Sequence, residues 1–251
     1  MLFRSVVVGT DPEWESEGHD RLDLSLPPGH AQLAAAVAAA QPNTVVVVNA
    51  GTIVDTSFAD GAPALLHSWF GGQEAATALA AVLLGRRDPG GRLPTTIPER
   101  VEHTPAFGTY PGENSIARYG EGLLMGYRWY DTRRLPVRFP FGFGLSYTTF
   151  DIAPPRVSGT EVVADTTITV EVEVTNTGSR AGHEVVQCYV AAQSSTLFRP
   201  EQELVAFAKV HLDPRETTTV RLDLTPRAFA HWDPADPGWD ERRATLRLFQ
   251  P

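Results

Sequence analysis

The segment "NTVVVVNAG", residues 43–51, contains four consecutive valines between polar residues and a closing glycine. Valine is β-branched and favours the extended backbone of a strand. A strand with one face in water alternates apolar and polar residues, whereas a continuous apolar run indicates a strand that is buried on both faces. Strands of this kind belong to parallel sheets that are covered by helices. Residues 44–49 are therefore predicted to form a strand of such a sheet.

Further strands and helices are predicted on either side of this strand. Residues 6–9 form a short β-branched run that ends in glycine, and residues 65–69 form another short apolar segment. Residues 31–40 are rich in alanine, and residues 73–84 carry apolar side chains at helical spacing before Gly85, a suitable C-cap. Strands that alternate with helices imply right-handed crossovers and an α/β fold class.

Residues 86–150 contain few regular patterns, because glycine and proline interrupt segments such as "DPGGRLPTTIP", residues 88–98, and "PFGFGLSYTTF", residues 140–150. Aromatic residues are dense in the same region. Long ordered loops of this composition usually wrap a neighbouring domain or line a site.

After about residue 154 the apolar residues recur at every second position, for example from Ile168 to Val174. Strands with this period, separated by turns, predict an antiparallel β-sandwich in which each sheet has one face in water. In residues 204–212 the alternation changes phase between Phe207 and Val210, which predicts a β-bulge there.

Composition excludes several classes of function. The formal net charge is -9 and the basic residues are scattered, which argues against a nucleic-acid surface and a basic membrane-docking patch. No apolar run approaches the roughly 20 residues that a spanning helix needs. A single cysteine, Cys188, excludes an internal disulfide and a cysteine-based metal cluster. The residues before the first strand are too few for a signal peptide, which favours the cytoplasm while the compartment stays open.

Seven segments occur in the order seen in family-3 glycoside hydrolases, the β-glucosidase and β-xylosidase family, and the chain resembles the C-terminal part of such an enzyme. The segments are "EWESEGHDR" (13–21), "LPPGHAQL" (26–33), "NTVVVVNAG" (43–51), "WFGGQE" (69–74), "DPGGRLPTTIP" (88–98), "EGLLMGYRWYD" (121–131) and "PFGFGLSYTTF" (140–150). The resemblance implies β-glucosidase-like hydrolysis, with retention, of terminal β-D-glucosyl residues from a β-linked oligosaccharide or aryl glucoside. It implies no metal and no other cofactor.

The resemblance also implies a domain organisation. Residues 1–100 correspond to a partial α/β sandwich, residues 101–153 to an aromatic and Gly/Pro-rich linker, and residues 154–251 to a fibronectin type III-like domain. The motifs of the family's N-terminal TIM-like barrel, which carries the nucleophilic aspartate, have no counterpart here. The chain is therefore expected to need a barrel on another polypeptide and to be inactive alone. The sequence after Trp239 is shorter than the family's hairpin and final strand, which predicts an incomplete sandwich edge.

The loop after the first predicted strand contains six carboxylates, and charge runs of this kind are usually a solvated surface. Retaining glycosidases need a nucleophile and a second carboxyl group that protonates the leaving oxygen and then activates water. The resemblance places this acid/base in a motif similar to Glu-Gly-Tyr-Asp-Arg, which matches Glu17 and the four residues after it, with His19 in place of the tyrosine. Glu15 is the alternative acid/base. The carboxylates are Asp11, Glu13, Glu15, Glu17, Asp20 and Asp23.

The other motifs favour structural roles. In "WFGGQE", Trp69 or Glu74 could bind substrate, but Gly71 and Gly72 favour a tight strand-to-helix turn. The motif "PFGFGLSY" favours a packed loop. Lone histidines such as His67 lack partners at metal-ligand spacing. Two alternatives to an enzyme part stay open: a non-catalytic module that binds a glycan or a protein, and an inactive truncated fragment.

Overall fold

A computed structural model describes residues 3–18, 20–159, 167–192, 195, 197–233, 235, 238–240 and 244–249. The chain forms two compact units that interleave along the sequence. Unit 1 comprises residues 1–87, 97–107 and 136–139, and unit 2 comprises residues 88–96, 108–135 and 140–251. The family-based boundaries at residues 100 and 154 stay predictions.

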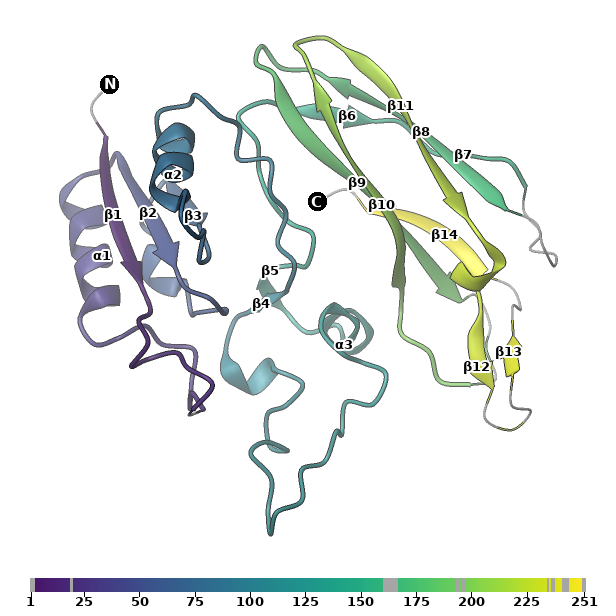
Figure 1. The fold of residues 1–251 in the computed structure, drawn as a ribbon, viewed down its shortest axis with the longest axis horizontal. Coiled ribbons are helices and arrows are strands. Elements are labelled where there is room, and N and C mark those ends of the chain that lie inside the picture. Colours follow the sequence, from purple (N-terminus) through teal and green to yellow (C-terminus); the bar gives the residue numbers. More distant parts are fainter. Residues whose placement is uncertain are drawn as a thin grey trace. The chain divides into compact units, whose positions relative to one another are not determined.

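The core of unit 1 is a three-stranded parallel sheet in the order β1-β2-β3, as the valine run predicts (Figure 1). Strand β1 is Arg4–Gly9, β2 is Thr44–Asn49 and β3 is Ala64–His67. Three of the four valines of β2 are fully buried, so both faces of this strand are covered. The predicted α/β class is therefore confirmed.

Helix α1, His30–Ala40, packs on one face of this sheet. Its Ala34 is fully buried among Val6, Val46 and Val48, which point to the same face because residues two apart in a strand share a side. Helix α2, Ala75–Leu83, ends where Gly85 adopts a positive φ of 68°, as the C-cap prediction requires. None of the side chains of α2 is buried.

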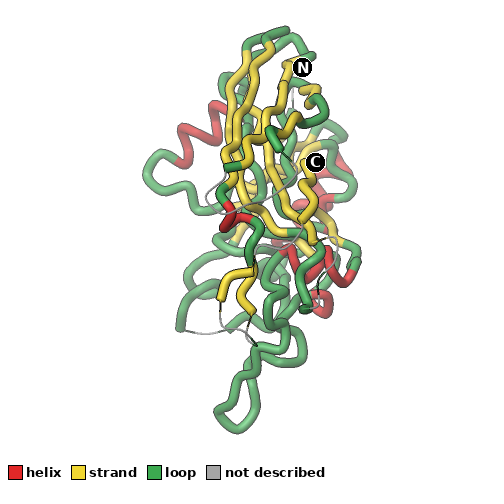
Figure 2. Tube along the Cα trace, turned by 90° about the vertical axis from the view of Figure 1, so that its right-hand side faces the viewer, coloured by secondary structure: helices red, strands yellow, loops and turns green. Residues whose placement is uncertain are grey.

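The core of unit 2 is an antiparallel β-sandwich (Figure 2), which confirms the expected second architecture. Its apolar core consists mainly of alternate residues of β8, β9 and β11. One sheet has the order β10-β9-β14, and the other has the order β11-β8-β6, with β7 also paired to β8. The strands are β6 Phe150–Ile152, β7 Arg156–Val157, β8 Ile168–Asn176, β9 Gly182–Ala192, β10 Glu203–Leu212, β11 Thr217–Leu224 and β14 Ala244–Phe249.

Two predictions about the sandwich are corrected. The register of β10 against β9 shifts between Leu204 and Ala206, so the irregularity lies at Val205 rather than between Phe207 and Val210. The sheet edge is also more complete than expected, because β14 pairs antiparallel with β9. A short hairpin of β12, His231–Asp233, and β13, Gly238–Asp240, precedes β14.

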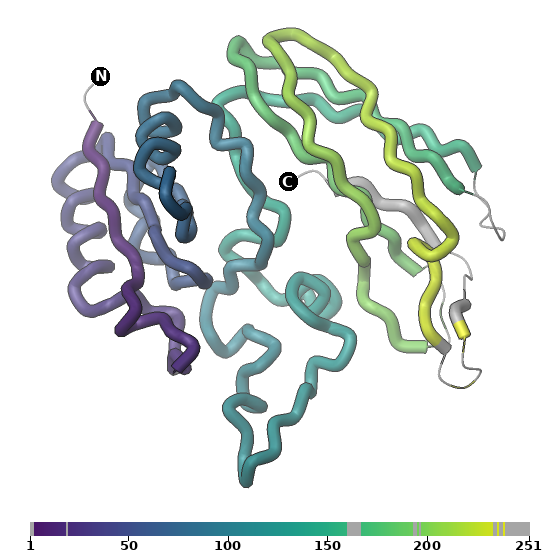
Figure 3. The backbone as a smooth tube through the Cα atoms, viewed as in Figure 1, coloured from purple at the N-terminus to yellow at the C-terminus, as the bar shows by residue number. Residues whose placement is uncertain are grey.

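The aromatic region contributes short elements to both units. In unit 1, β4 (Ile97–Pro98) pairs with β5 (Val137–Phe139). In unit 2, a long loop over residues 108–126 leads into helix α3, Tyr127–Arg133, which the sequence patterns did not predict (Figure 3). Three 3₁₀ turns complete the described elements: Ser57–Ala59, Val101–His103 and Pro226–Ala228.

Aromatic side chains join α3 and the glycine-rich loop to strand β9. The Tyr127 ring stacks on Phe141, with ring centroids 4.7 Å apart, and meets the buried Tyr189 edge-on at 5.9 Å. The side-chain amide of the buried Gln187 donates to the Gly142 carbonyl, and its oxygen accepts from the Tyr189 hydroxyl. A β-carbon at Gly142 would lie 2.1 Å from the Gln187 oxygen, so glycine is required. These contacts confirm the structural interpretation of "PFGFG".

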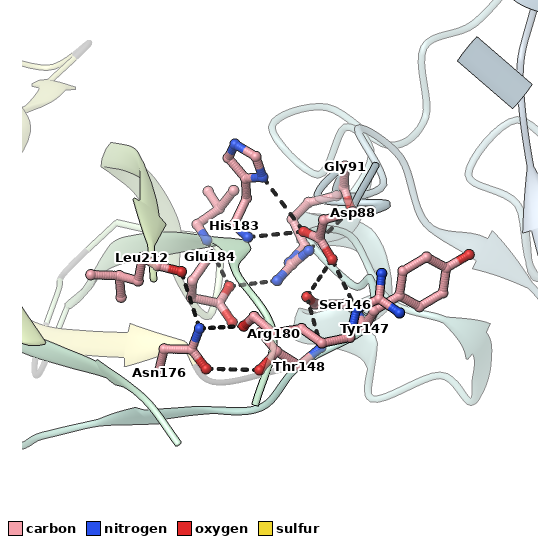
Figure 4. Close-up of polar contacts among 12 residues, drawn as sticks. Asp88, Gly91, Ser146, Tyr147, Thr148, Asn176, Arg180, His183, Glu184 and Leu212 are labelled. Carbon is pink, nitrogen blue, oxygen red and sulfur yellow. Dashed lines mark hydrogen bonds and ion pairs between the residues drawn. The ribbon is translucent and has the colours of Figure 1, made fainter. Parts of the chain in front are cut away.

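Two charged residues of the "DPGGRLPTTIP" segment bind the same strand. The Asp88 carboxylate accepts hydrogen bonds from the Ser146 hydroxyl and from the backbone amides of Tyr147 and His183 (Figure 4). Burial raises the pKa of Asp88, but these hydrogen bonds outweigh it and the net pKa lies below its usual value. Arg92 forms a 2.6 Å ion pair with Glu184, and their side chains are only 7% and 8% exposed.

Because this ion pair is buried, removal of one partner should be costly. We expect Arg92→Met to lower the free energy of unfolding by about 3–5 kcal/mol, since it leaves the buried Glu184 carboxylate without its cation. Urea denaturation followed by tryptophan fluorescence measures this loss. The double variant Arg92→Met/Glu184→Met should recover most of it. A loss below about 1 kcal/mol in the single variant would instead indicate a pair that behaves as if solvated.

Candidate active site

The loops that follow the three parallel strands of unit 1 emerge at one edge of the sheet. The pairing aligns Val8 with Val48, and Val48 with His67, close to the carboxyl end of each strand. The pairing extends into the loops, because the Thr10 amide donates to the Asn49 carbonyl at 3.1 Å. In open α/β sheets, ligands bind beyond the carboxyl ends of the strands. This edge is therefore the candidate site, and the acidic loop is one of its components.

The acidic loop begins with a single tight turn. One Asp11 carboxylate oxygen accepts from the backbone amides of Glu13 and Trp14, and the Asp11 carbonyl accepts from the amide of Glu15. The Trp14 indole then donates to the Ser25 carbonyl at 3.0 Å, which ties the turn to the far end of the loop. Local hydrogen bonds thus hold residues 11–15. The Asp11 side chain accepts from the backbone of its own turn, as Asp and Asn side chains commonly do.

Arg21 fixes the second half of this loop. Its guanidinium donates to the Thr52 hydroxyl and the Ile53 carbonyl in the segment after β2, and to the Ser25 carbonyl. The sequence did not predict these partners. Thr52 is 31 residues away from Arg21, and no local spacing rule connects the two positions.

The six carboxylates of the loop divide into two groups. Asp11, Glu15 and Asp23 accept hydrogen bonds within the unit; the donors to Asp23 are the amide and hydroxyl of Ser25, and they lower the pKa of this carboxyl. The side chains of Glu13, Glu17 and Asp20 are exposed and make no hydrogen bond or ion pair to any residue that the structure describes. His19, which lies between Glu17 and Asp20, is outside the described residues.

Glu15 is turned toward its own unit. One carboxylate oxygen, Oε2, accepts both the Thr10 hydroxyl at 2.6 Å and the Gly51 amide at 3.1 Å. The other oxygen, Oε1, lies 2.8 Å from the position that a β-carbon at residue 51 would occupy, and the Phe70 ring lies 2.6 Å from it. A β-carbon at residue 51 would therefore displace the Glu15 carboxylate or the Phe70 ring from their present positions.

His67 and Trp69 complete the edge of the sheet. Their rings lie 3.9 Å apart, and Trp69 has a positive φ of 52°, which is unusual for an aromatic residue. The nitrogens of His67 are buried and lack a well-formed hydrogen bond to any described residue. Burial lowers the pKa of His67 to about 4, although the backbone of Thr52 and the charge of Glu15 act in the opposite direction.

The remaining predicted motifs have the geometry of structural elements. Gly72 has a φ of 68°, and a β-carbon at Gly71 would lie 2.9 Å from that of Ala75, so both glycines serve the turn into α2. Among the described residues, no group of three or more His, Cys, Asp and Glu side chains is placed to hold a metal ion. No described helix is long and apolar enough to cross a membrane.

Two family models match the sequence. The model of the glycosyl hydrolase family 3 C-terminal domain matches residues 5–147, and the model of the fibronectin type III-like domain matches residues 184–248. A β-glucosidase from Rhizobium radiobacter is 44% identical over 91% of this chain, and a thermostable β-glucosidase B from Acetivibrio thermocellus is 42% identical over 93%. The chain spans 28% and 31% of the lengths of these two relatives.

Solved structures share the fold over almost the whole chain. A family-3 β-glucosidase from Bifidobacterium adolescentis superposes with a TM-score of 0.92, at 38% identity, over 98% of this chain and 37% of its own. A β-glucosidase from Streptomyces venezuelae, crystallised with D-glucose, superposes with a TM-score of 0.92, at 36% identity, over 98% of this chain and 32% of its own.

The environment of His67 predicts an unusual titration. With a pKa of about 4, the imidazole should stay neutral well below the midpoint of about 6.5 that an unperturbed histidine shows. A pH series of ¹H–¹³C imidazole spectra measures this midpoint, and His67→Gln identifies the resonance by its disappearance. A midpoint close to that of an unperturbed histidine would contradict the burial argument.

The same shift has a consequence for stability. The folded-state pKa lies below the unfolded value, so acid protonates the unfolded chain first and stability falls as the pH drops from about 6.5 toward the folded-state pKa. The variant His67→Gln should lose less stability than the wild type over this interval in urea titrations.

Proposed function

We propose that this chain, which belongs to glycosyl hydrolase family 3, is the C-terminal portion of a retaining β-glucosidase and supplies its general acid/base, Glu17. The observation that carries the proposal is that Glu17 extends into solvent, exposed and without a partner among the described residues, from a loop that is anchored on both sides. A free carboxyl group on a fixed backbone suits a residue that reaches toward a substrate held elsewhere.

In the proposed reaction, a β-D-glucosyl group is transferred twice. A carboxylate nucleophile attacks the anomeric carbon while the Glu17 carboxyl donates its proton to the departing glycosidic oxygen, which releases the aglycone. The resulting Glu17 carboxylate then takes a proton from water, the water oxygen attacks the anomeric carbon, and the nucleophile leaves. The two inversions give retention. Substrates of this proposal are β-linked oligosaccharides and aryl β-glucosides.

The other carboxylates of the loop are less suited to this role. Asp11, Glu15 and Asp23 already accept hydrogen bonds that hold the loop, so protonation would disturb the backbone around them. Glu13 and Asp20, like Glu17, have no partner among the residues that the structure describes, but only Glu17 stands at the glutamate of the family motif, before Gly18. A glycine after the acid lets the chain turn away without a β-carbon beside the carboxyl group.

The nucleophile of the proposed reaction belongs to a TIM-like barrel polypeptide, which is the proposed partner. The relatives at 42–44% identity are named as β-glucosidases, and this chain spans less than a third of each. We therefore expect no turnover from the chain alone and turnover once a barrel is supplied. The part of the Rhizobium radiobacter β-glucosidase that this chain does not match is a suitable complement.

The test compares leaving groups in the chain supplemented with that barrel. Glu17→Gln should lower kcat/KM for cellobiose about 10²- to 10⁴-fold, because the departing alkoxide needs the proton. The same variant should lower kcat/KM for 2,4-dinitrophenyl β-glucoside far less, since the 2,4-dinitrophenolate leaving group departs unprotonated. With Glu17→Ala, added azide should restore turnover and form β-glucosyl azide, which thin-layer chromatography detects.

Glu13→Gln is the matched control, because Glu13 is equally exposed and equally free of partners in the described structure. This variant should leave kcat/KM for both substrates nearly unchanged. A loss in Glu13→Gln as large as that in Glu17→Gln, or an equal loss for both leaving groups in Glu17→Gln, would refute the assignment.

A further inference from the structure

One carboxylate oxygen joins two loops at the edge of the parallel sheet. Oε2 of Glu15 accepts the Thr10 hydroxyl, on the loop after β1, and the Gly51 amide, on the loop after β2. Glu15 and Gly51 are 36 positions apart in sequence. A side chain that links two such segments restrains both of them.

We propose that Glu15 is a positioning residue that fixes the segment carrying Glu17, an inference that rests on the proposed function of Glu17. Glu17 follows Glu15 by two residues, and no described contact holds its own side chain. The direction in which Glu17 extends therefore depends on the backbone on both sides of it: Arg21 holds the segment after it, and Glu15 holds the segment before it. The Glu15 bridge ties that backbone to the loop after β2.

The surroundings of Gly51 support this role. Oε1 of Glu15 and the Phe70 ring both lie within 3 Å of the place where a β-carbon of residue 51 would stand. The glutamate thus occupies space that any other residue at position 51 would take. The backbone on either side of the bridge is also fixed, because the Thr10 amide donates to the Asn49 carbonyl and the Glu15 amide donates to the Asp11 carbonyl.

The bridge needs an acceptor oxygen but not a negative charge. Both donors point to the same oxygen atom, so the amide oxygen of glutamine can accept both of them in the same place. A residue that transfers a proton cannot be replaced in this way, because an amide does not exchange a proton in the reaction. Glu15→Gln and Glu15→Ala therefore separate a positioning role from a catalytic one.

The first arm of the test uses the full chain alone and reads hydrogen exchange of the Gly51 amide and ¹⁵N relaxation of residues 16–18. Glu15→Ala should speed Gly51 exchange about tenfold, the loss of one hydrogen bond, and should make residues 16–18 more mobile. Glu15→Gln should stay close to the wild type. Glu13→Ala, a neighbouring exposed carboxylate, is the control and should change neither reading.

A second pair of variants probes the bridge without touching Glu15. Thr10→Val removes one of the two donors and keeps the shape of the side chain, whereas Thr10→Ser keeps the hydroxyl. We expect Thr10→Val to reproduce part of the Glu15→Ala effect and Thr10→Ser to reproduce none. This pair keeps the test decisive even if Glu15→Ala fails to fold.

The second arm measures kcat/KM in the chain supplemented with the barrel. Glu15→Ala should lower kcat/KM for cellobiose by up to about 10²-fold, because misplacement of a catalytic group costs rates of this order, and should lower it far less for 2,4-dinitrophenyl β-glucoside, whose leaving group does not need the proton of Glu17. Glu15→Gln should restore most of the activity. A loss in Glu15→Gln as severe as in Glu15→Ala, confined to cellobiose, would overturn the proposal and identify Glu15 as the acid.

The two arms separate this inference from the proposed function. Unchanged Gly51 exchange and unchanged mobility of residues 16–18 in both Glu15→Ala and Thr10→Val would overturn the positioning role whatever the activity shows. Absence of turnover in the supplemented wild type would refute the proposed function and, with it, a role in positioning a catalytic residue, while the first arm still reports whether the bridge restrains the loop.

Discussion

The in-register parallel pairing of β1, β2 and β3 is the constraint on which the candidate site depends. Because the pairing aligns Val8, Val48 and His67, the chain leaves all three strands at one edge, and residues separated by dozens of positions meet there. The alternating burial of β1 holds this register, since Val6 and Val8 are buried and Val7 is exposed, and a shift by one residue would exchange these two faces of the strand. Every contact of Glu15 and Arg21 across the loops follows from that alignment.

The six carboxylates of the acidic loop have two different structural roles. Three carboxylates bind backbone amides or hydroxyl groups and give the loop its shape, while three project into solvent. The hydrogen-bonded carboxylates serve through an acceptor oxygen. The exposed carboxylates are available to exchange a proton with a group outside the unit. Two glutamates separated by one serine belong to different groups. The sequence motif named Glu17 as the acid/base with Glu15 as the alternative, and the structure shows that only Glu15 accepts hydrogen bonds within the unit.

The sequence predicted much of the fold because local patterns express it directly. The valine run, the alanine-rich helix and the two-residue period each reflect burial, which acts on neighbouring residues. The position of the bulge and the last strand escaped prediction, because Val205 and β14 are set by pairing with β9 rather than by their own composition. In the site, the motif selected Glu17, but nothing local linked Glu15 to Gly51 or Arg21 to Thr52, since those pairs meet only through the sheet.

The contacts of unit 2 bear on how such a protein changes over evolutionary time. The β9 face that carries Gln187 and Tyr189 is covered by α3 and by the loop around Gly142, and Asp88 and Arg92 bind the start of the same strand. A recombination event that transferred only the sandwich strands would leave buried polar groups unpaired, at a cost of about 1–3 kcal/mol for each hydrogen-bonding group. The part of the chain that could be transferred without this cost is therefore larger than the sandwich, because it also includes the segments that carry Asp88, Arg92, Gly142 and α3, which precede or flank these strands.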